Sequence, residues 1–142
     1  MLYALSIQSF VLIDRLQLEA SDGFTALTGE TGAGKSIILD AIGLVLGGAA
    51  DRKQVRTGAD QASITAEFAV LPDHGAGQIL DLYGLAFDRG ETVTLRRTVS
   101  RAVPSRAFIN GQPVAASVLA QIGETLVEIH GQHAASQLMR AA

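Results

Sequence analysis

The chain contains no cysteine. This absence excludes disulfide bridges and thiolate metal sites, and it agrees with a reducing compartment such as the cytoplasm. No uninterrupted apolar run approaches the roughly 18 residues needed to cross a bilayer, although 48% of the 142 residues are hydrophobic. The chain also opens without the basic segment and cleavage site of a secretory signal. We therefore expect one cytoplasmic domain with a large core and no membrane partner.

The chain also has no large excess of charge of either sign. The formal net charge is −3 at pH 7, so bulk electrostatics do not indicate a nucleic-acid-binding protein. Four arginines nevertheless fall within eleven residues, namely Arg96, Arg97, Arg101 and Arg106. On a hairpin they could meet phosphate groups, and the alternative is a solvated face of a β-sheet. The sequence by itself favours the solvated face.

A glycine-rich motif is the most specific feature that is present. It matches G-x-x-x-x-G-K-[ST], the phosphate-binding P-loop, between a predicted strand over 24–28 and a predicted helix over 36–46 that ends at Gly47 and Gly48. Backbone N–H groups of such a loop surround phosphates at the positive end of the helix dipole, Lys35 reaches the β- and γ-phosphates, and the Ser36 hydroxyl binds Mg²⁺. We expect a nucleotide to be held by Gly29, Glu30, Thr31, Gly32, Ala33, Gly34, Lys35, Ser36 and Ile37.

Alternating and turn-rich segments surround this motif. Period-two patterns predict two strands, at 3–8 and 16–19, on either side of a short turn before the P-loop. Asn110 and Gly111 form the strongest turn signal, because both residues tolerate a positive φ. The remaining predicted elements are strands over 62–70, 92–100 and 106–109, helices near 76–83 and 115–123, and a buried strand over 126–129.

Other parts of a phosphoryl-transfer site are missing from the sequence. A P-loop ATPase needs a second strand that brings an Asp to Mg²⁺ and a group that orients the attacking water. The segment 10–14 has four apolar residues before Asp14, but it precedes the P-loop and reads better as a strand turn. Gln132, after the predicted strand over 126–129, could offer its amide to Mg²⁺ and water, or could be an ordinary polar turn residue. His130 and His133 lack a third ligand for a metal site.

Six segments together resemble the RecN family of bacterial DNA-repair proteins, which is similar to the SMC proteins. They are residues 5–10, 27–36, 46–50, 55–58, 106–111 and 129–133. The resemblance implies an α/β fold, the N-terminal lobe of an ABC/SMC-type P-loop NTPase head, with a mixed sheet around the P-loop helix and an antiparallel β-subdomain. Residues 1–142 would then be a partial domain, without the coiled coil and the C-terminal lobe that carries the signature, Walker B and H-loop motifs.

The resemblance also implies roles for individual residues. By position Gln132 corresponds to the Q-loop glutamine at Mg²⁺ and the attacking water, and with Lys35 it is expected to be catalytic. Arg56 resembles the arginine that points toward nucleotide or DNA, although Arg52 is near enough to be confused with it. ATP and Mg²⁺ are the implied cofactors. The implied partners are the C-terminal lobe, a second identical head and DNA, with the protein located at the nucleoid.

Two other functions remain open from the sequence. A self-contained P-loop kinase or GTPase would need no second lobe, but no guanine-recognition Asn-Lys-x-Asp and no arginine-rich lid are present. A nucleotide-binding scaffold that never hydrolyses ATP is the other alternative. We expect ATPase activity of the complete protein in DNA double-strand-break repair, and no activity of residues 1–142 alone.

Overall fold

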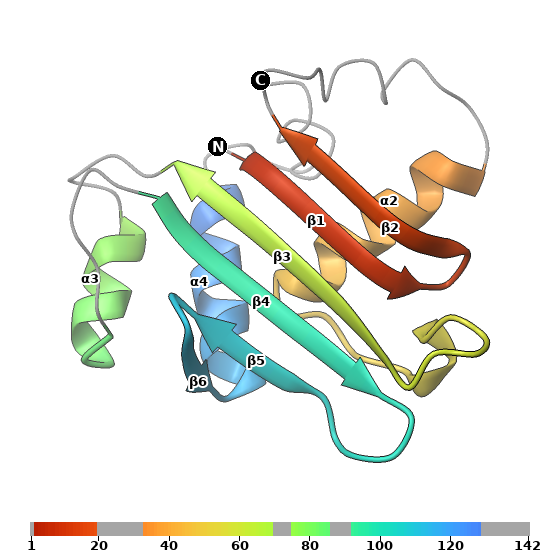
Figure 1. Ribbon diagram of the computed structural model, residues 1–142. Helices are drawn as coiled ribbons and strands as arrows, with labels where there is room; N and C mark the ends of the chain where they lie inside the picture. Colours follow the sequence, from red (N-terminus) through yellow and green to blue (C-terminus); the bar gives the residue numbers. More distant parts are fainter. Residues whose placement is uncertain (1, 20–32, 70–74, 86–91, 129–142) are drawn as a thin grey trace.

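Six antiparallel strands form the centre of the computed structural model, which describes residues 2–19, 33–69, 75–85 and 92–128 (Figure 1). In spatial order the sheet runs β2-β1-β3-β4-β5-β6. The strands are β1 (Leu2–Phe10), β2 (Ile13–Glu19), β3 (Gln61–Ala69), β4 (Thr92–Ser100), β5 (Arg106–Ile109) and β6 (Gln112–Val114). The helices are α2 (Ala33–Val45), the 3-10 helix η2 (Arg52–Gln54), α3 (Gly75–Leu82) and α4 (Ala116–Glu128).

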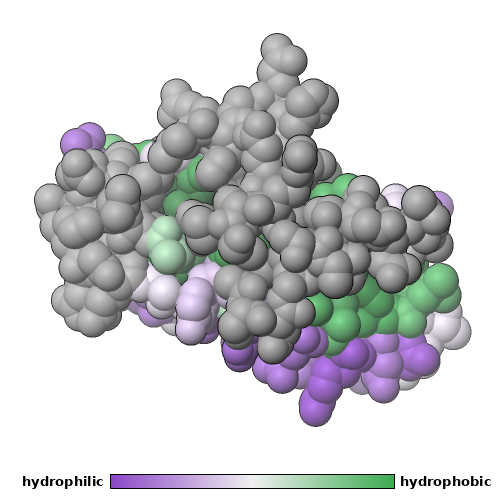
Figure 2. Space-filling view, turned by 90° about the horizontal axis from the view of Figure 1, so that it is seen from above, coloured by the Kyte–Doolittle hydropathy of each residue, from purple (hydrophilic) through white to green (hydrophobic). Residues whose placement is uncertain are grey.

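The two faces of the sheet differ in polarity. One face is apolar and is covered by α2 and α4, which lie behind the sheet in Figure 1. Its alternating side chains are fully buried in the centre, among them Leu5, Ile7, Ile64, Ala66 and Leu95. The opposite face, called here the open face, carries polar side chains and is covered by no described helix. Viewed from above, hydrophilic residues gather along the lower margin, with hydrophobic residues directly above them (Figure 2).

The predicted strand pattern is confirmed in most places. The two strands before the P-loop pair through Leu5 with Leu18 and Ile7 with Leu16, and the turn between them includes Leu12. The segment 10–14 is therefore a strand turn, as the sequence indicates. The predicted strand over 24–28, which would make the sheet mixed, lies outside the described residues. The antiparallel subdomain is present as β3 to β6.

The Asn-Gly turn is also confirmed. Asn110 and Gly111 have φ of 50° and 82° and connect β5 to β6, a strand that the sequence patterns did not predict. The Asn110 side chain accepts a hydrogen bond of 2.9 Å from the backbone N–H of Thr94 on β4. This contact ties the turn to the neighbouring strand as well as to its own hairpin.

One predicted element is wrong. The sequence predicts a strand over 126–129, but α4 continues through Glu128, and Ile129 lies outside the described residues. Leu119, Ile122 and Leu126 recur at a helical spacing and are all buried on one side of α4. Gly123 lies within this helix, and its missing side chain lets α4 approach the carbonyl group of Leu46 closely.

We expect Gly123→Ala to destabilise the fold despite the better helix propensity of alanine. A Cβ at this position would overlap the carbonyl oxygen of Leu46, and such overpacking costs about 1–3 kcal/mol. Gly43→Ala on α2 is the matched control, since no described atom lies within 4 Å of its Cβ position and only the propensity gain of about 1 kcal/mol applies. Urea unfolding of both variants gives the comparison. Equal stabilisation by both would contradict the close packing of α4 on Leu46.

Candidate functional site

The P-loop motif runs into helix α2. This helix begins at Ala33, so its first turn contains Ala33, Gly34, Lys35 and Ser36. The first N–H groups of a helix have no partner within the helix, and no acidic side chain occupies this turn. Ser36 is exposed and Ile37 is half-buried. N–H groups at a helix start and a serine hydroxyl there are the groups that suit a phosphate with its Mg²⁺. Gly29, Glu30, Thr31 and Gly32 lie outside the described residues, as do the side-chain surroundings of Lys35.

Packing explains the position of this helix. Ile38, Ala41, Ile42 and Val45 recur at i, i+3, i+4 and i+7 and are buried beneath the sheet. At the other end the Gly48 N–H donates to the Gly43 carbonyl and the Gly47 N–H donates to the Leu44 carbonyl, at 3.0 and 3.1 Å. With φ of 104° at Gly47, this is a Schellman cap. The predicted helix end at Gly47 and Gly48 is therefore confirmed.

Arg97, which lies on β4, forms hydrogen bonds to the same end of α2. Its Nη1 donates to the carbonyl oxygens of Leu44 at 3.0 Å and Gly48 at 2.9 Å, and its Nη2 donates to Ser105 Oγ at 3.2 Å. The residue is 3% exposed, and burial lowers the pKa of its guanidinium. A cation is favourable at a helix C-terminus, and the last turn of α2 contains none of its own.

Arg101 also has a structural role. Its Nε donates to the Ala59 carbonyl at 2.9 Å, and its Nη2 donates to the carbonyls of Val55 at 3.1 Å and Arg56 at 3.0 Å. One side chain at the end of β4 thus braces the segment 55–59. The four arginines over 96–106 do not form one surface group, because Arg97 is buried beneath the sheet and Arg101 is bonded to the segment 55–59. Sequence alternation contained the signal, since Arg97 falls in the apolar row of Val93, Leu95 and Val99.

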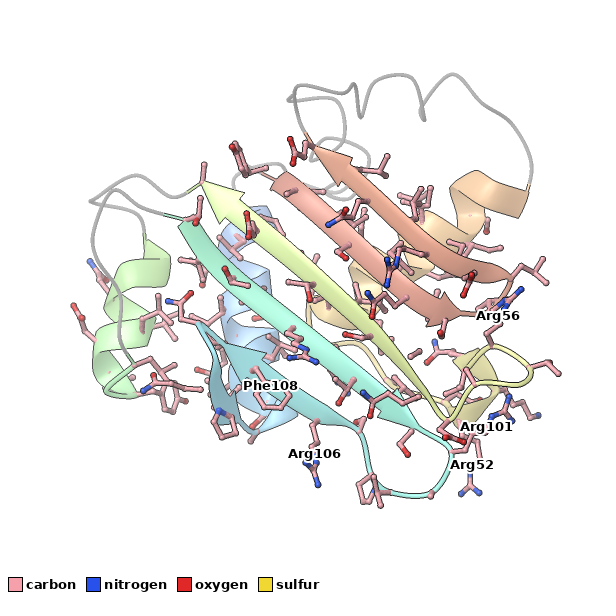
Figure 3. The ribbon with its side chains drawn as sticks, viewed as in Figure 1. Arg52, Arg56, Arg101, Arg106 and Phe108 are labelled. Atoms are coloured by element: carbon pink, nitrogen blue, oxygen red, sulfur yellow. The ribbon has the colours of Figure 1, made fainter. Side chains whose placement is uncertain are left out.

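The other two arginines of the group lie on the open face. Arg96 and Arg106 are exposed, and Arg96 is paired in register with Phe108 on β5. The Arg96 guanidinium carbon lies 5.5 Å from the centroid of the Phe108 ring, a cation–π distance. Figure 3 shows Arg106 and Phe108 on β5, Arg52 and Arg101 beyond them near the end of β4, and Arg56 near the end of β1. Contact with phosphate groups and a solvated face both remain open as hypotheses, but only for Arg96 and Arg106.

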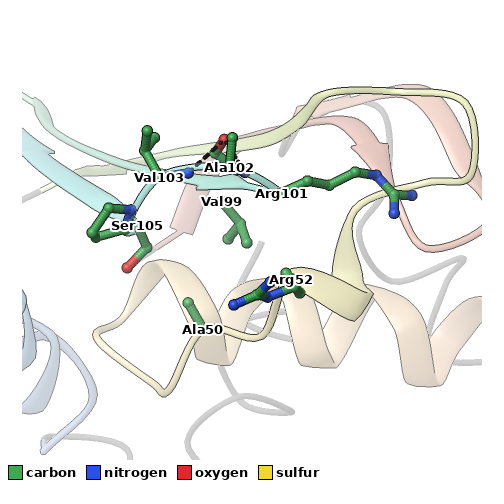
Figure 4. A pocket seen from close by; sticks show the side chains of 9 residues that line it. Ala50, Arg52, Val99, Arg101, Ala102, Val103 and Ser105 are labelled. Carbon is green, nitrogen blue, oxygen red and sulfur yellow. Dashed lines mark hydrogen bonds between the residues drawn. The ribbon is translucent and has the colours of Figure 1, made fainter.

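Arg56 and Arg52, which the sequence could not distinguish, have different surroundings. The Arg56 N–H donates to the Ser9 carbonyl at 2.8 Å, and Arg56 Nη1 lies 3.8 Å from Asp14 Oδ1. Arg56 is therefore beside the β1–β2 turn. The Arg52 side chain instead lines a cavity of about 320 Å³ beneath the β4–β5 loop, where Figure 4 shows it between Ala50 and Val99.

The remaining predicted site residue lies outside the structure's described part. Gln132 falls there together with His130 and His133. Within the described ranges, no group of three His, Cys, Asp or Glu side chains could hold a metal ion. None of the helices in those ranges is long and apolar enough to cross a membrane.

Comparison with known proteins identifies relatives over nearly the whole chain. The "DNA repair protein RecN" of Vibrio cholerae is 46% identical over 140 residues, which is 99% of this chain and 25% of that protein. The RecN of Bacillus subtilis is 38% identical over 144 residues, 98% of this chain and 24% of that protein. The chain thus spans about a quarter of the length of the curated relatives that it matches.

Solved structures with the same fold include heads of SMC proteins. An SMC ATPase described for ATP-driven dimerization and DNA-stimulated activation matches with a TM-score of 0.66 and 25% identity, over 88% of this chain and 78% of that chain. The SMC head domain from Thermotoga maritima matches with a TM-score of 0.58 and 21% identity, over 84% of this chain and 41% of that chain. The fold is therefore that of an ABC/SMC-type P-loop NTPase lobe. A family profile described as "AAA domain" matches residues 4–137, and the chain accordingly belongs to the AAA domain family, with RecN proteins among its relatives.

Proposed function

We propose that this chain binds ATP with Mg²⁺ and forms the N-terminal lobe of an SMC-like ATPase head that acts in DNA double-strand-break repair. The observation that carries the proposal is the helix α2, which begins inside the P-loop motif and presents an exposed Ser36 in its first turn. Similarity to RecN over 99% of the chain supports the role in repair.

Each site residue has a specific task in this proposal. The backbone of residues 29–34 surrounds the phosphates, Lys35 neutralises charge at the β- and γ-phosphates, and the Ser36 hydroxyl holds Mg²⁺. Ile37 continues the helix behind the loop and keeps its first turn against the core. Gln132 contacts Mg²⁺ and orients water, and Arg56 adds positive charge from the side of the β1–β2 turn.

Hydrolysis requires groups beyond these residues. Water attacks the γ-phosphorus, the bond to the β–γ bridging oxygen breaks, and the products are ADP, phosphate and a proton. The water must be oriented by a carboxylate, and the γ-phosphate must be enclosed from the opposite side. We assign both tasks to a C-terminal lobe and a second, identical head, so that ATP holds two heads together. The SMC ATPase described for ATP-driven dimerization supports this assembly. DNA is then a further partner, and the protein would be located in the cytoplasm at the nucleoid.

We expect residues 1–142 alone to bind ATP weakly and to show no turnover above background. The P-loop and Gln132 supply phosphate and Mg²⁺ contacts, but the carboxylate that orients water and the opposing surface that closes the site are to come from the C-terminal lobe and the second head. Phosphate release by the purified chain should rise when the C-terminal lobe is added in trans. Robust hydrolysis by the chain alone, abolished by Lys35→Ala, would contradict the half-site proposal and favour a compact P-loop enzyme.

Gln132→Ala in the complete protein should separate binding from hydrolysis. The phosphate contacts stay in place while Mg²⁺ and water lose an oriented amide, so we expect kcat to fall about 100-fold with little change in ATP affinity. Steady-state phosphate release and an ATP titration measure the two quantities. A wild-type kcat would show that Gln132 is an ordinary turn residue.

A further inference from the structure

The β1–β2 turn fixes the backbone of Arg56 from one side. The Arg56 N–H donates to the Ser9 carbonyl at 2.8 Å, and the Val11 N–H donates to the Gln54 carbonyl at 2.7 Å. Val55, between these two bonds, is buried in the core. Ser9 and Val11 both have a φ of 54°, which a β-branched residue such as valine rarely adopts, so this shape persists only where contacts hold it. The turn and the Arg56 segment therefore form one unit.

Arg101 fixes the same segment from the other side. Its Nη2 donates to the carbonyl groups that flank the Arg56 Cα, those of Val55 at 3.1 Å and Arg56 at 3.0 Å, and its Nε donates to the Ala59 carbonyl at 2.9 Å. The Ala59 N–H in turn donates to the Arg56 carbonyl at 3.0 Å across a tight turn in which Gly58 has a φ of 92°. Figure 4 shows Arg101 extending away from the cavity beneath the β4–β5 loop. A rigid guanidinium that meets three carbonyl groups leaves them little freedom to move.

The Arg56 side chain has a much weaker contact of its own. Its Nη1 lies 3.8 Å from Asp14 Oδ1, and the two side chains are 44% and 80% exposed. An ion pair this long and this exposed contributes little, so it does not determine where the guanidinium of Arg56 points. The hydrogen bonds of the two peptide groups around Arg56 set the direction of its Cα–Cβ bond instead. One of those groups is bonded to Arg101 alone among the described side chains, and the other to Arg101 and the Ala59 N–H.

We propose that Arg101 is a positioning residue for Arg56, which it aims at the ATP held by the P-loop. The inference rests on the proposed role of Arg56 and names the side chain on which that role depends. A guanidinium stabilises charge in a transition state only in one place, and a displacement of about 1 Å can cost about 100-fold in rate. Arg101 itself has no contact with ATP in this proposal. Its removal should therefore slow turnover and leave ATP binding unchanged.

The first test is a double-mutant cycle on ATP hydrolysis by the complete protein without DNA. We expect kcat of Arg101→Ala to fall about 10-fold while the Kd for ATP stays within about twofold of wild type. Arg56→Ala/Arg101→Ala should be no slower than Arg56→Ala, because a positioning residue has nothing left to position. Arg101→Lys should recover part of kcat, since an ammonium group donates to some of the same carbonyls.

Arg106→Ala is the matched control for the lost charge. Arg106 is also exposed and follows the same β4–β5 loop, but in the described part of the chain it forms no hydrogen bond to the segment 55–59. Its kcat in the absence of DNA should equal that of wild type. Thermal unfolding curves confirm that each variant is folded.

The second test needs no ATP. Hydrogen–deuterium exchange is followed in peptides that cover residues 9–11 and 54–59, whose amides join the turn to the segment. We expect exchange there to be about 10-fold faster in Arg101→Ala than in wild type, and unchanged in Arg106→Ala, because only Arg101 restrains the segment.

Four results would overturn the inference. They are a wild-type kcat in Arg101→Ala, a loss in the double variant equal to the product of the two single losses, a raised Kd for ATP with unchanged kcat, and unchanged exchange of the two peptides. A wild-type kcat in Arg56→Ala would refute the role of Arg56 and the inference with it. Failure of the wild type to bind or hydrolyse ATP would instead refute the proposed function, and the exchange measurement would still decide whether Arg101 fixes the segment.

Discussion

Lys35→Ala should abolish measurable ATP binding. The ammonium group contacts the most highly charged part of the ligand, and backbone dipoles alone cannot replace a full positive charge there. The position of Lys35 in the first turn of α2 places its backbone at the start of that helix, where the phosphates are expected. We expect the Kd for ATP to rise at least about 100-fold, which is roughly 2.7 kcal/mol of binding free energy.

A fluorescent-ATP titration measures this loss, and the chain supplies its own control. Lys53, on the 3-10 helix η2, is the second of the two lysines, and it is exposed. Lys53→Ala changes the net charge by the same amount and should leave ATP affinity unaltered. If Lys35→Ala bound ATP with wild-type affinity, the P-loop assignment would be refuted.

Arg97→Ala should cause the largest loss of stability among the arginine variants. It removes three hydrogen bonds from a buried guanidinium, two of them to carbonyl groups at the end of α2, and it leaves a space in the core. Loss of such a buried network costs about 2–4 kcal/mol. The substitution also removes the cost of burying the Arg97 charge, and this cost is what lowers the pKa of Arg97. We therefore do not expect the upper end of the range.

Arg96→Ala is the natural comparison, since it changes the neighbouring residue on the other face of β4. Arg96 is exposed and has a cation–π contact with Phe108, so its removal should cost less than about 1 kcal/mol. Urea unfolding monitored by circular dichroism gives both values. Equal losses in the two variants would contradict the structural role assigned to Arg97.

Local signals predicted most of the fold. The alternation in β4 and β5 gave the bounds 92–100 and 106–109 that the structure has, and Asn110 and Gly111 gave the turn. The end of α4 could not be predicted in the same way. Residues 126–128 are mostly apolar and locally fit a strand or a helix, and Leu126 joins the buried helical row of Leu119 and Ile122 that packs in the core.

For a similar reason, the sequence predicts the P-loop part of the candidate site but not the roles of the arginines. A P-loop is encoded in consecutive residues, so its position at the start of α2 follows from the sequence alone. The roles of the arginines depend on contacts that are distant in the sequence. Arg97 meets carbonyl groups about 50 positions earlier in the chain, and Arg52 and Arg56 differ only in which loop lies beside them. Gln132 keeps its predicted role as a proposal.

The attachment of α2 at one end has a mechanical consequence. Arg97 and the glycine cap fix the C-terminal end of this helix to β4, whereas the P-loop joins its other end. A helix of 13 residues is about 20 Å long, and its buried row from Ile38 to Val45 makes it move as one rigid rod with Arg97 at its fixed end. A rotation of about 5° there would move the first turn by about 2 Å, close to the scale at which phosphate contacts form or break. We therefore expect nucleotide exchange to tilt α2 rather than slide it along its axis.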